Sequence, residues 1–513
     1  MKILTSKEVY KSQKEAIENF GIPSLTLLGS AALAATDIII SRIKDYNRRN
    51  ILIFAGKGDN GGNGFAIGRM LYSKGYNVIV IFLEEKSKIS NDALINMKRA
   101  NNLDIVESPS LVKIKKYVMD SDIVVDALFD YECSEKIEKP YDTIIEYINN
   151  FSKHTISIEI PSGLNKDTGA IANIAVKADE TIVFECPKLG LLIRKGPEYA
   201  GHMTVTDINF PKEIVNNLKT KYYYINKKEA YEMLPKQNIR STKDNFEYLA
   251  VIGGQSSMVG ALYLTSKSAY RVGAGVVSSY LASSEISTLQ TLIPEAIIQS
   301  YNQENLSTII ENVTQYNGIV IGPGMGISEI NKFFLKEILL KANNNIVIDA
   351  DGISNLIEIK EFLHSAQKIP VITPHLGEMS RLTGVSIKKI LEQPLETASS
   401  FAREHNTIVL LKDSRTIIAH PNGQIYINTT GSLSLAKGGS GDVLSGIIGG
   451  LIAQGLDSFQ SCILGAYIHG LAEELAAKEL TNYSLLASDI VNNIPKAIKD
   501  ILKLQKYSFL SNI

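Results

Sequence analysis

The chain is poor in cysteine and lacks tryptophan, and the scarcity of cysteine excludes some classes of protein. It contains three cysteines and no tryptophan in 513 residues. Cys133, Cys186 and Cys462 are far apart in the sequence, which argues against a disulfide framework or a thiolate zinc site. We therefore expect buried or unreactive thiols.

An excess of one charge and long apolar runs are also missing. Lys and Arg number 53 against 54 Asp and Glu, a net charge of −1, so no overall field favours nucleic acid or an anionic membrane. No uncharged apolar run approaches about 18 residues, and the charged amino terminus lacks a secretory apolar segment. These absences predict a cytoplasmic protein of small-molecule partners, with neither nucleic acid nor membrane among them.

The composition that remains is that of a globular protein with more than one domain. Hydrophobic residues make up 45% of the chain and charged residues 21%, and the length exceeds what one core supports. Two series of strand-like runs alternate with helix-like stretches, which predicts mostly parallel sheets with helices on both faces. These runs lie at 50–56, 77–83, 122–129, 155–160 and 180–185, then at 248–254, 318–324, 345–352, 370–375, 407–412 and 416–420.

A polar stretch rich in Lys and Asn separates the two series. It covers residues 212–245 and is typical of a connection with one short helix. We therefore predict an α/β fold with two domains, at 1–218 and 222–513, each a three-layer sandwich.

The most informative motif is a glycine-rich turn, Gly438-Gly439-Ser440-Gly441-Asp442, that opens an apolar helical run. Such a turn directs free backbone N–H groups at an anion. A carboxylate beside phosphate-binding amides can take a proton from a hydroxyl while that hydroxyl attacks a phosphoryl group. The motif predicts phosphoryl transfer to a small alcohol, with Asp442 as the base.

Four more turns follow predicted strands of the second series. Open α/β sheets gather ligands at the carboxyl ends of their strands, so we expect these turns to converge. Each is weak alone, because a glycine turn is often only a tight turn, a lone histidine is more often structural, and a lysine can solvate a strand end. The turns are Gly322–Gly326, Asp349–Gly352, Thr373–His375 and Lys412–Thr416.

Taken together, these turns resemble the ribokinase-like superfamily. Their order, from VIGG at 251–254 to LAKGGSGDVL at 435–444, resembles more closely the NAD(P)H-hydrate dehydratase family. The resemblance implies a ribokinase-like domain that removes water from the S form of NADH or NADPH hydrate. It also implies ADP, with ATP as the alternative, and Mg²⁺. Phosphorylation would turn the hydroxyl on C6 into a phosphate, which leaves far more readily.

The same resemblance implies roles for individual residues. Contacts to the hydrated nicotinamide nucleotide fall on Ala261, Gly324, His375 and Asp442. Contacts to the adenine nucleotide fall on Lys412, Asp413, Ser414, Arg415, Thr416 and Gly441.

The first domain has its own glycine turn, AGKGDNGGNG at 55–64. Glycines at 56, 58 and 61 fit a dinucleotide fingerprint, and Glu84 or Glu85 follows about 20 residues on, so a dehydrogenase is one alternative and a simple turn is another. With VVDALF at 124–129 and EIPSG at 159–163, however, the turn resembles the NAD(P)H-hydrate epimerase family.

This second resemblance implies a Rossmann-like domain that interconverts the R and S hydrates. It implies hydrate contacts from Asp59, Asn60, Gly61, Gly62, Asn63 and Glu159. It further implies a potassium ion held by Asn60, Asp126 and Ser162. A homo-oligomer is implied by family resemblance only.

The first domain departs from the epimerase pattern at three places. Asn63 replaces an acidic residue, Glu159 replaces an aspartate, and Asp130-Tyr131-Glu132-Cys133 stands where a glycine-rich turn is usual. Two carboxylates there would repel a pyrophosphate that expects backbone amides. The hypothesis is therefore a domain that keeps its fold and ion site but whose epimerase activity is weakened or lost.

Two other functions stay open at this point. A small-molecule kinase would share Gly441 and Asp442 but release a stable phosphorylated product. A non-catalytic nucleotide sensor would bind without turnover.

Overall fold

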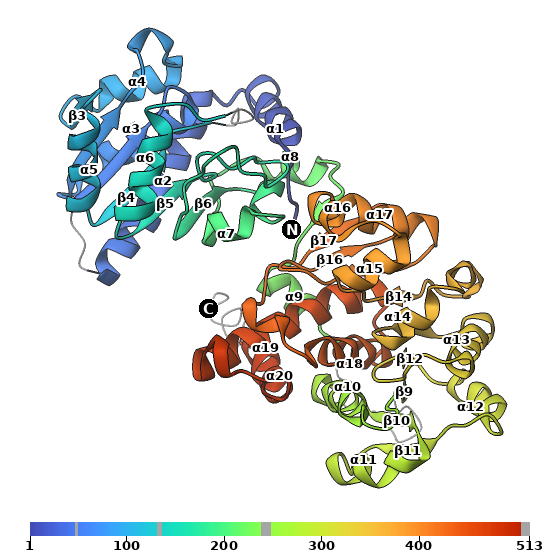
Figure 1. Cartoon of the computed structure of the whole chain (residues 1–513). Helices are drawn as coiled ribbons and strands as arrows, with labels where there is room; N and C mark the ends of the chain where they lie inside the picture. Colours follow the sequence, from blue (N-terminus) through green and yellow to red (C-terminus); the bar gives the residue numbers. More distant parts are fainter. Residues whose placement is uncertain (47–49, 131–135, 237–247, 504–513) are drawn as a thin grey trace, which may run out of the picture. The chain divides into compact units, whose positions relative to one another are not determined.

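The computed structural model describes residues 1–46, 50–130, 136–236 and 248–503, which form two compact units (Figure 1). The first unit is Lys2–Tyr222, and the second is Tyr223–Ile513 with Met1. Cys186 and Cys462 are buried, as expected, whereas Cys133 lies outside the described residues.

The first unit is built on one sheet of seven strands, all parallel. The strand order reverses between β1 and β4, and such a switch point is where open α/β sheets bind ligands. In spatial order the strands are β3 Asp104–Glu107, β2 Asn77–Phe82, β1 Asn50–Ala55, β4 Ile123–Ala127, β5 Thr155–Ile158, β6 Glu180–Phe184 and β7 His202–Thr206.

Alternating side chains of the central strands bury two faces. Ile51 and Ile53 of β1 join a core with α2 and α3, whereas Leu52 and Phe54 join a core with α5 and α6. This alternation gives the three-layer sandwich that the sequence predicts. The helices are α1 Ser6–Glu18, α2 Ser24–Tyr46, α3 Asp59–Ser73, α4 Asn91–Arg99, α5 Leu111–Asp120, α6 Tyr141–Phe151, α7 Gly196–Ala200 and α8 Lys212–Asn217.

Among the described helices, α2 is the one whose length and composition would let it cross a membrane, over Ser24–Ile43. A core helix meets the same test. In this structure α2 lies along α3 and contributes Leu28, Ala31, Ala32, Ala35 and Ile39 to the core of the first unit.

The second unit is built on a sheet of ten strands, parallel from β11 to β15 and antiparallel through β15, β16 and β17. Its order reverses between β9 and β12. In spatial order the strands are β11 Ile297–Ser300, β10 Val276–Leu281, β9 Tyr248–Ile252, β12 Gly318–Ile321, β13 Asn345–Ile348, β14 Val371–Ile372, β15 Ile408–Leu411, β16 Ile417–Ala419, β17 Ile425–Ile427 and β8 Tyr222–Tyr223.

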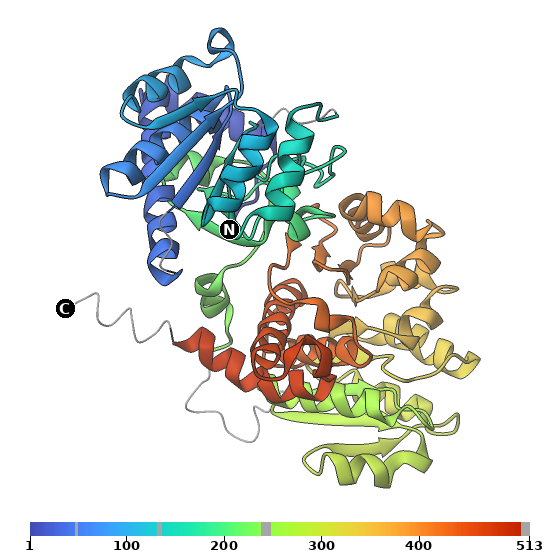
Figure 2. The ribbon, with the colours of Figure 1, turned by 60° about the vertical axis from the view of Figure 1, so that its left-hand side comes forward.

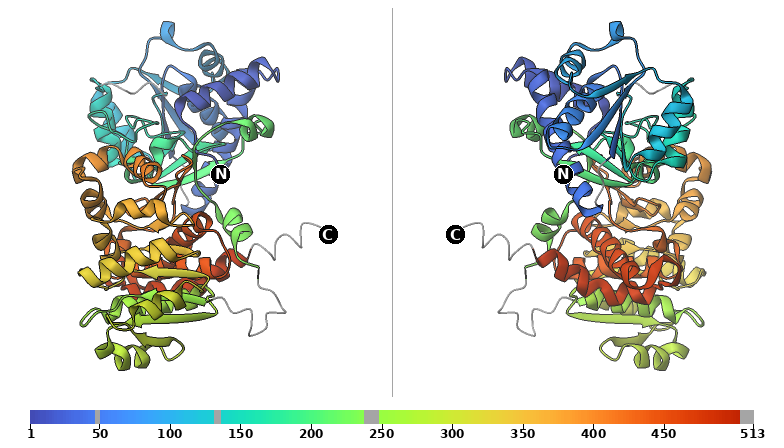
Figure 3. Two further views of the ribbon diagram at one scale, coloured as in Figure 1. Left: turned by 90° about the vertical axis from the view of Figure 1, so that its right-hand side faces the viewer. Right: turned by 90° about the vertical axis from the view of Figure 1, so that its left-hand side faces the viewer.

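Helices cover this sheet on both faces, as Figures 1, 2 and 3 show. Helices α10, α18, α19 and α20 pack together over one face, where Leu249, Val251 and Val320 join their core. The two-domain α/β fold class is therefore confirmed. The helices are α9 Lys227–Met233, α10 Val259–Val272, α11 Ile286–Leu292, α12 Leu306–Val313, α13 Glu329–Lys341, α14 Asp351–Leu356, α15 Leu376–Thr383, α16 Ile387–Glu392, α17 Pro394–Glu404, α18 Ser440–Ala453, α19 Ser458–Ser484 and α20 Ala487–Leu502.

Two details differ from the sequence-based expectation. The described part of the polar stretch, residues 212–236, holds two short helices, α8 and α9, where one was expected, and Asn226 caps α9 by accepting a hydrogen bond from the Glu229 N–H at 2.9 Å. Residues 59–63, expected as a loop, are instead the first turn of α3.

Candidate active sites

The turns of the second unit converge where β9, β12, β13, β14 and β15 end. The amide of Gly254 donates to the carbonyl of Pro323 over 3.0 Å, which joins the turns after β9 and β12. The amide of Gly326 donates to Oδ2 of Asp351 over 2.8 Å, which joins the turns after β12 and β13. The amide of Lys412 donates to the carbonyl of Pro374 over 2.8 Å, which joins the turns after β14 and β15.

A buried carboxylate, Asp349, ties this surface to α18. It accepts hydrogen bonds from Thr373 Oγ1 at 2.6 Å and Lys412 Nζ at 2.8 Å, and another from Ser445 Oγ. Burial alone raises the pKa of Asp349, yet the Lys412 ammonium and these hydrogen bonds hold that pKa below its usual range. Burial alone lowers the pKa of Lys412, but the negative charge of Asp349 outweighs the effect of burial and raises that pKa. Lys412 and Asp349 therefore form an ionised pair.

The ammonium of Lys412 lies at the amino terminus of α18. A Cβ on Gly441 would lie 3.2 Å from Nζ of Lys412 and 3.9 Å from Oδ2 of Asp349. Gly439, which caps the helix, has φ +89°, a backbone conformation that favours glycine. The turn therefore directs the amino terminus of α18 and the Lys412 ammonium at the same space, an arrangement that suits an anion.

Asp442 stands in the first turn of α18. Burial, reinforced by the negative charge of Asp349, raises its pKa to about 7, although Lys412 opposes this shift. A carboxyl that titrates near neutral pH is well suited to accept a proton at the anion site.

A neutral histidine lies behind this turn. Oγ of Ser440 and Nε2 of His469 are 3.2 Å apart, and burial lowers the pKa of His469 to about 4. His469 therefore adds no positive charge to the site.

Three of the residues predicted to contact the hydrated nicotinamide nucleotide lie in two places: Ala261 and Gly324 where α10 meets the turn after β12, and His375 beside Lys412. A Cβ on Gly324 would lie 3.2 Å from Cβ of Ala261 and 2.6 Å from the carbonyl oxygen of Met258, so the turn after β12 approaches α10 closely. His375 caps α15: its Nδ1 accepts from the Gly377 amide at 2.9 Å. A backbone bridge between His375 and Lys412 sets these two side by side.

The rest of the predicted adenine-nucleotide turn leads away from α18. Asp413 and Ser414 are exposed between β15 and β16, and Nη1 of Arg415 donates to the carbonyl of Thr429 over 2.5 Å. The backbone of Thr416 pairs with Asn428 over 2.9 Å. The structure thus joins Lys412, Gly441 and Asp442 in one cluster, and the roles of all these residues stay predictions.

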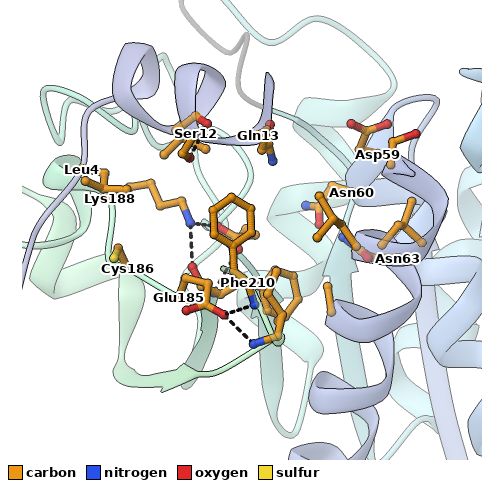
Figure 4. A pocket seen from close by; sticks show the side chains of 18 of the residues that line it. Leu4, Ser12, Gln13, Asp59, Asn60, Asn63, Glu185, Cys186, Lys188 and Phe210 are labelled. Atoms are coloured by element: carbon orange, nitrogen blue, oxygen red, sulfur yellow. Dashed lines mark hydrogen bonds and ion pairs between the residues drawn. The ribbon is translucent and has the colours of Figure 1, made fainter. Parts of the chain in front are cut away.

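The first unit has a cavity of about 160 Å³ beside the switch point of its sheet (Figure 4). Asp59, Asn60, Asn63 and Glu159, for which hydrate contacts are predicted, line it. Gly61 and Gly62 are not among its lining residues, and both are closely packed: a Cβ on Gly61 would overlap the carbonyl of Gly56, and one on Gly62 would lie 3.2 Å from Cα of Ala93.

Two of the predicted potassium ligands, Asp126 and Ser162, are in direct contact, and burial raises the pKa of the Asp126 carboxyl although its hydrogen bonds oppose this. Asp126 is fully buried and accepts hydrogen bonds from Ser157 Oγ at 2.8 Å and Ser162 Oγ at 2.6 Å. Both amide protons of Asn60 point to carbonyls, of Phe129 and Ile158 at 3.1 Å, and its buried Oδ1 has no hydrogen-bond partner among the described residues. Hard oxygen donors around a buried carboxylate fit a monovalent cation.

A buried lysine pairs with the carboxylate at the end of β5. Lys188 is 3% exposed and forms an ion pair with Glu159, which also accepts the Phe184 amide at 2.9 Å. Glu159 holds φ at +69°, a conformation that costs a non-glycine residue about 1 kcal/mol. Sequence reasoning placed Asp349 in a converging turn but gave it no role, and it missed Lys188; the one available signal for Lys188 is a lone charge in the apolar run CPKLGLL.

Family comparisons agree with this division of the chain. The sequence model described as NAD(P)H-hydrate dehydratase matches residues 249–496, and the one described as YjeF-related protein N-terminus matches residues 24–190.

Similar proteins span the whole chain. The bifunctional NAD(P)H-hydrate repair enzyme Nnr of Moorella thermoacetica is 32% identical over 98% of this chain and 97% of its own length. The enzyme of the same name from Dictyoglomus turgidum is 32% identical over 98% of this chain and 99% of its own. Among solved structures, a ribokinase-like superfamily protein of Enterococcus faecalis V583 is 27% identical with a TM-score of 0.50, covering 56% of this chain and 98% of its own.

Proposed function

The chain belongs to the family of bifunctional NAD(P)H-hydrate repair enzymes, and from this membership we propose how its own residues divide the work. The second unit dehydrates the S hydrate and the first unit epimerises the R and S hydrates. The observation that carries the proposal is Asp442, a carboxyl of pKa about 7 in the first turn of α18.

In the second unit, Asp442 takes the proton of the C6 hydroxyl while that hydroxyl attacks the terminal phosphoryl group of the nucleotide. The amide of Gly441 and the ammonium of Lys412 stabilise the charge on that phosphoryl group. The ring nitrogen lone pair then expels phosphate from C6, and loss of a proton from C5 restores the double bond. Phosphoryl transfer and elimination therefore use one pocket.

The phosphate donor is ADP, with ATP as the alternative. Asp349, Asp351 and Glu378 all act electrostatically on Asp442, and this acidic surrounding fits a divalent cation. Mg²⁺ bound to the nucleotide would neutralise part of its phosphate charge. These substrates are soluble metabolites, in keeping with a cytoplasmic location.

In the first unit, Asn60, Asp126 and Ser162 would hold a potassium ion, which supplies fixed positive charge when bound. Glu159 takes the proton of the C6 hydroxyl as the C6–N1 bond opens to an aldehyde, with the bond's electron pair passing to N1, and returns the proton when N1 closes on the opposite face of C6. Lys188 keeps the carboxylate of Glu159 in place. The activity is weakened relative to the family, because Glu159 is one methylene longer than the usual aspartate and a displacement of about 1 Å slows catalysis markedly.

One assay tests the dehydratase proposal against its alternatives. The chain is incubated with the S form of NADH hydrate, ADP or ATP, and Mg²⁺, while NADH absorbance and free phosphate are followed. Equal amounts of NADH and phosphate are expected. A stable phosphorylated product would instead indicate a kinase, and binding without turnover a sensor.

A further inference from the structure

The amino terminus of α3 is already occupied by a carboxylate of the chain itself. The amide of Asn60 donates to Oδ1 of Asp130 over 2.6 Å. Gly58, the residue before the helix, has no side chain to cap it, and a Cβ there would overlap the Asp130 carboxylate. Asp130 therefore lies directly against the glycine turn that follows β1.

This helix end lies at the cavity of the first unit, and an unpaired polar atom in the cavity wall indicates that a ligand binds there. Asn63 is 7% exposed, lines the cavity, and its Oδ1 has no hydrogen-bond partner among the described residues (Figure 4). An unpaired buried acceptor lowers the stability of the fold, so this oxygen is suited to accept a hydrogen bond from a bound molecule. The amides of α3 and the Asn63 oxygen thus belong to one binding surface.

The charge around this surface opposes an anionic ligand. The described residues that line the cavity include five carboxylates and one basic side chain, Lys188. Lys188 is paired with Glu159. The carboxylates are Asp59, Asp92, Asp130, Glu159 and Glu185.

We propose that Asp130 acts as an internal substitute for a phosphate group, occupying the α3 amides that the pyrophosphate of the hydrated dinucleotide would otherwise use. The substrate must displace this carboxylate or bind beside it, and both weaken binding through like-charge repulsion. Asp130 therefore lowers the affinity of the first unit for the hydrated dinucleotide. The inference rests on the proposed epimerase function, since it takes the dinucleotide as the ligand.

Two variants of the full chain distinguish the effect of the negative charge of Asp130 from the effect of its hydrogen bond to the amino terminus of α3. Asp130→Asn keeps an oxygen that caps α3 but removes the charge, and Asp130→Gly removes both. Each should lower KM for the R hydrate by about tenfold, with kcat unchanged or higher. Asp142→Asn, a carboxylate in the first turn of α6, is the matched control and should leave KM unchanged. Thermal unfolding followed by circular dichroism shows whether the first unit is folded in each variant, because Asp130 lies in that unit.

A second readout needs no catalysis. Inorganic pyrophosphate should shift the amide NMR signals of Asn60 and Gly61 in both Asp130 variants, and much less in the unmodified chain. If neither KM nor these signals change, Asp130 does not block the site and the inference is wrong. If all three proteins lack epimerase turnover while pyrophosphate shifts the signals in the variants alone, the epimerase proposal fails and the blocking role of Asp130 stands.

Discussion

At the scale of single residues, the dehydratase account depends on how Asp442 and its neighbours share charge. Neighbouring carboxylates raise the pKa of Asp442, and the Lys412 ammonium lowers it. Asp349 holds that ammonium in place by accepting a hydrogen bond from it. Raising the pKa of a base towards the working pH makes it a better proton acceptor while leaving a usable ionised fraction.

The pH dependence of dehydration follows directly from this pKa. Asp442 acts as a base only when ionised, so turnover should fall as the pH drops through about 7. Asp442→Asn should lower turnover by about 10² to 10⁴ with nucleotide binding nearly unchanged. Steady-state rates between pH 5 and 9 and a nucleotide titration of the variant check both; a rate independent of pH would contradict the assignment.

Asp349→Asn tests the electrostatic cause. The negative charge of Asp349 raises the pKa of Asp442, second to burial, and its removal also frees the Lys412 ammonium to act on Asp442. Both changes favour the ionised carboxylate, so the acid limb of the pH–rate profile should move to lower pH. A limb that stays in place or moves upward would show that Asp349 does not influence Asp442.

A role could be predicted from the sequence only for residues that belong to a recognisable local motif. Asp442 and Gly441 stand in a glycine turn that opens a helix, and Lys412 follows a strand. Asp349 and Lys188 act through partners that are 63 and 29 positions away in the chain, so their pairing appears only with the fold. Asp130 was expected to repel a phosphate, but its hydrogen bond to the Asn60 amide needed the structure.

At the scale of elements, buried strands were easier to predict than edge strands. Every predicted run contains a strand. The strands β3, β7, β8, β10, β11 and β17 were missed. Four of them, β3, β7, β8 and β11, are sheet edges, where side chains are half-exposed and apolar runs are broken. The buried β10 was missed because Ser278 and Ser279 interrupt its apolar run, and β17 is only three residues long. Burial on both faces gives the central strands their continuous Val and Ile runs.

The start of α18 offers a test at this scale. Gly439→Ala places a side chain at φ +89° and brings its Cβ to 2.8 Å from Cδ1 of Leu264. The second unit should lose about 1–2 kcal/mol of unfolding free energy. Gly438→Ala is the matched control, because a Cβ there has no atom within 4 Å. Chemical denaturation measures both; equal stabilities would mean that the turn is not held as described.

At the scale of the whole molecule, the two proposed sites lie in different compact units. If the first unit epimerises slowly and the second dehydrates, a mixture of R and S hydrates should be repaired in two phases. The fast phase consumes the S form already present, and the slow phase is limited by conversion of R to S.

The most direct test of this account is the time course of NADH recovery from such a mixture, with ADP and Mg²⁺, in the unmodified chain and two variants. Glu159→Gln should keep the fast phase and lose the enzyme-dependent slow phase, and Asp442→Asn should lose both. A Glu159→Gln variant with the slow phase intact, or an Asp442→Asn variant that still restores NADH at the normal rate, would contradict the proposed division of labour.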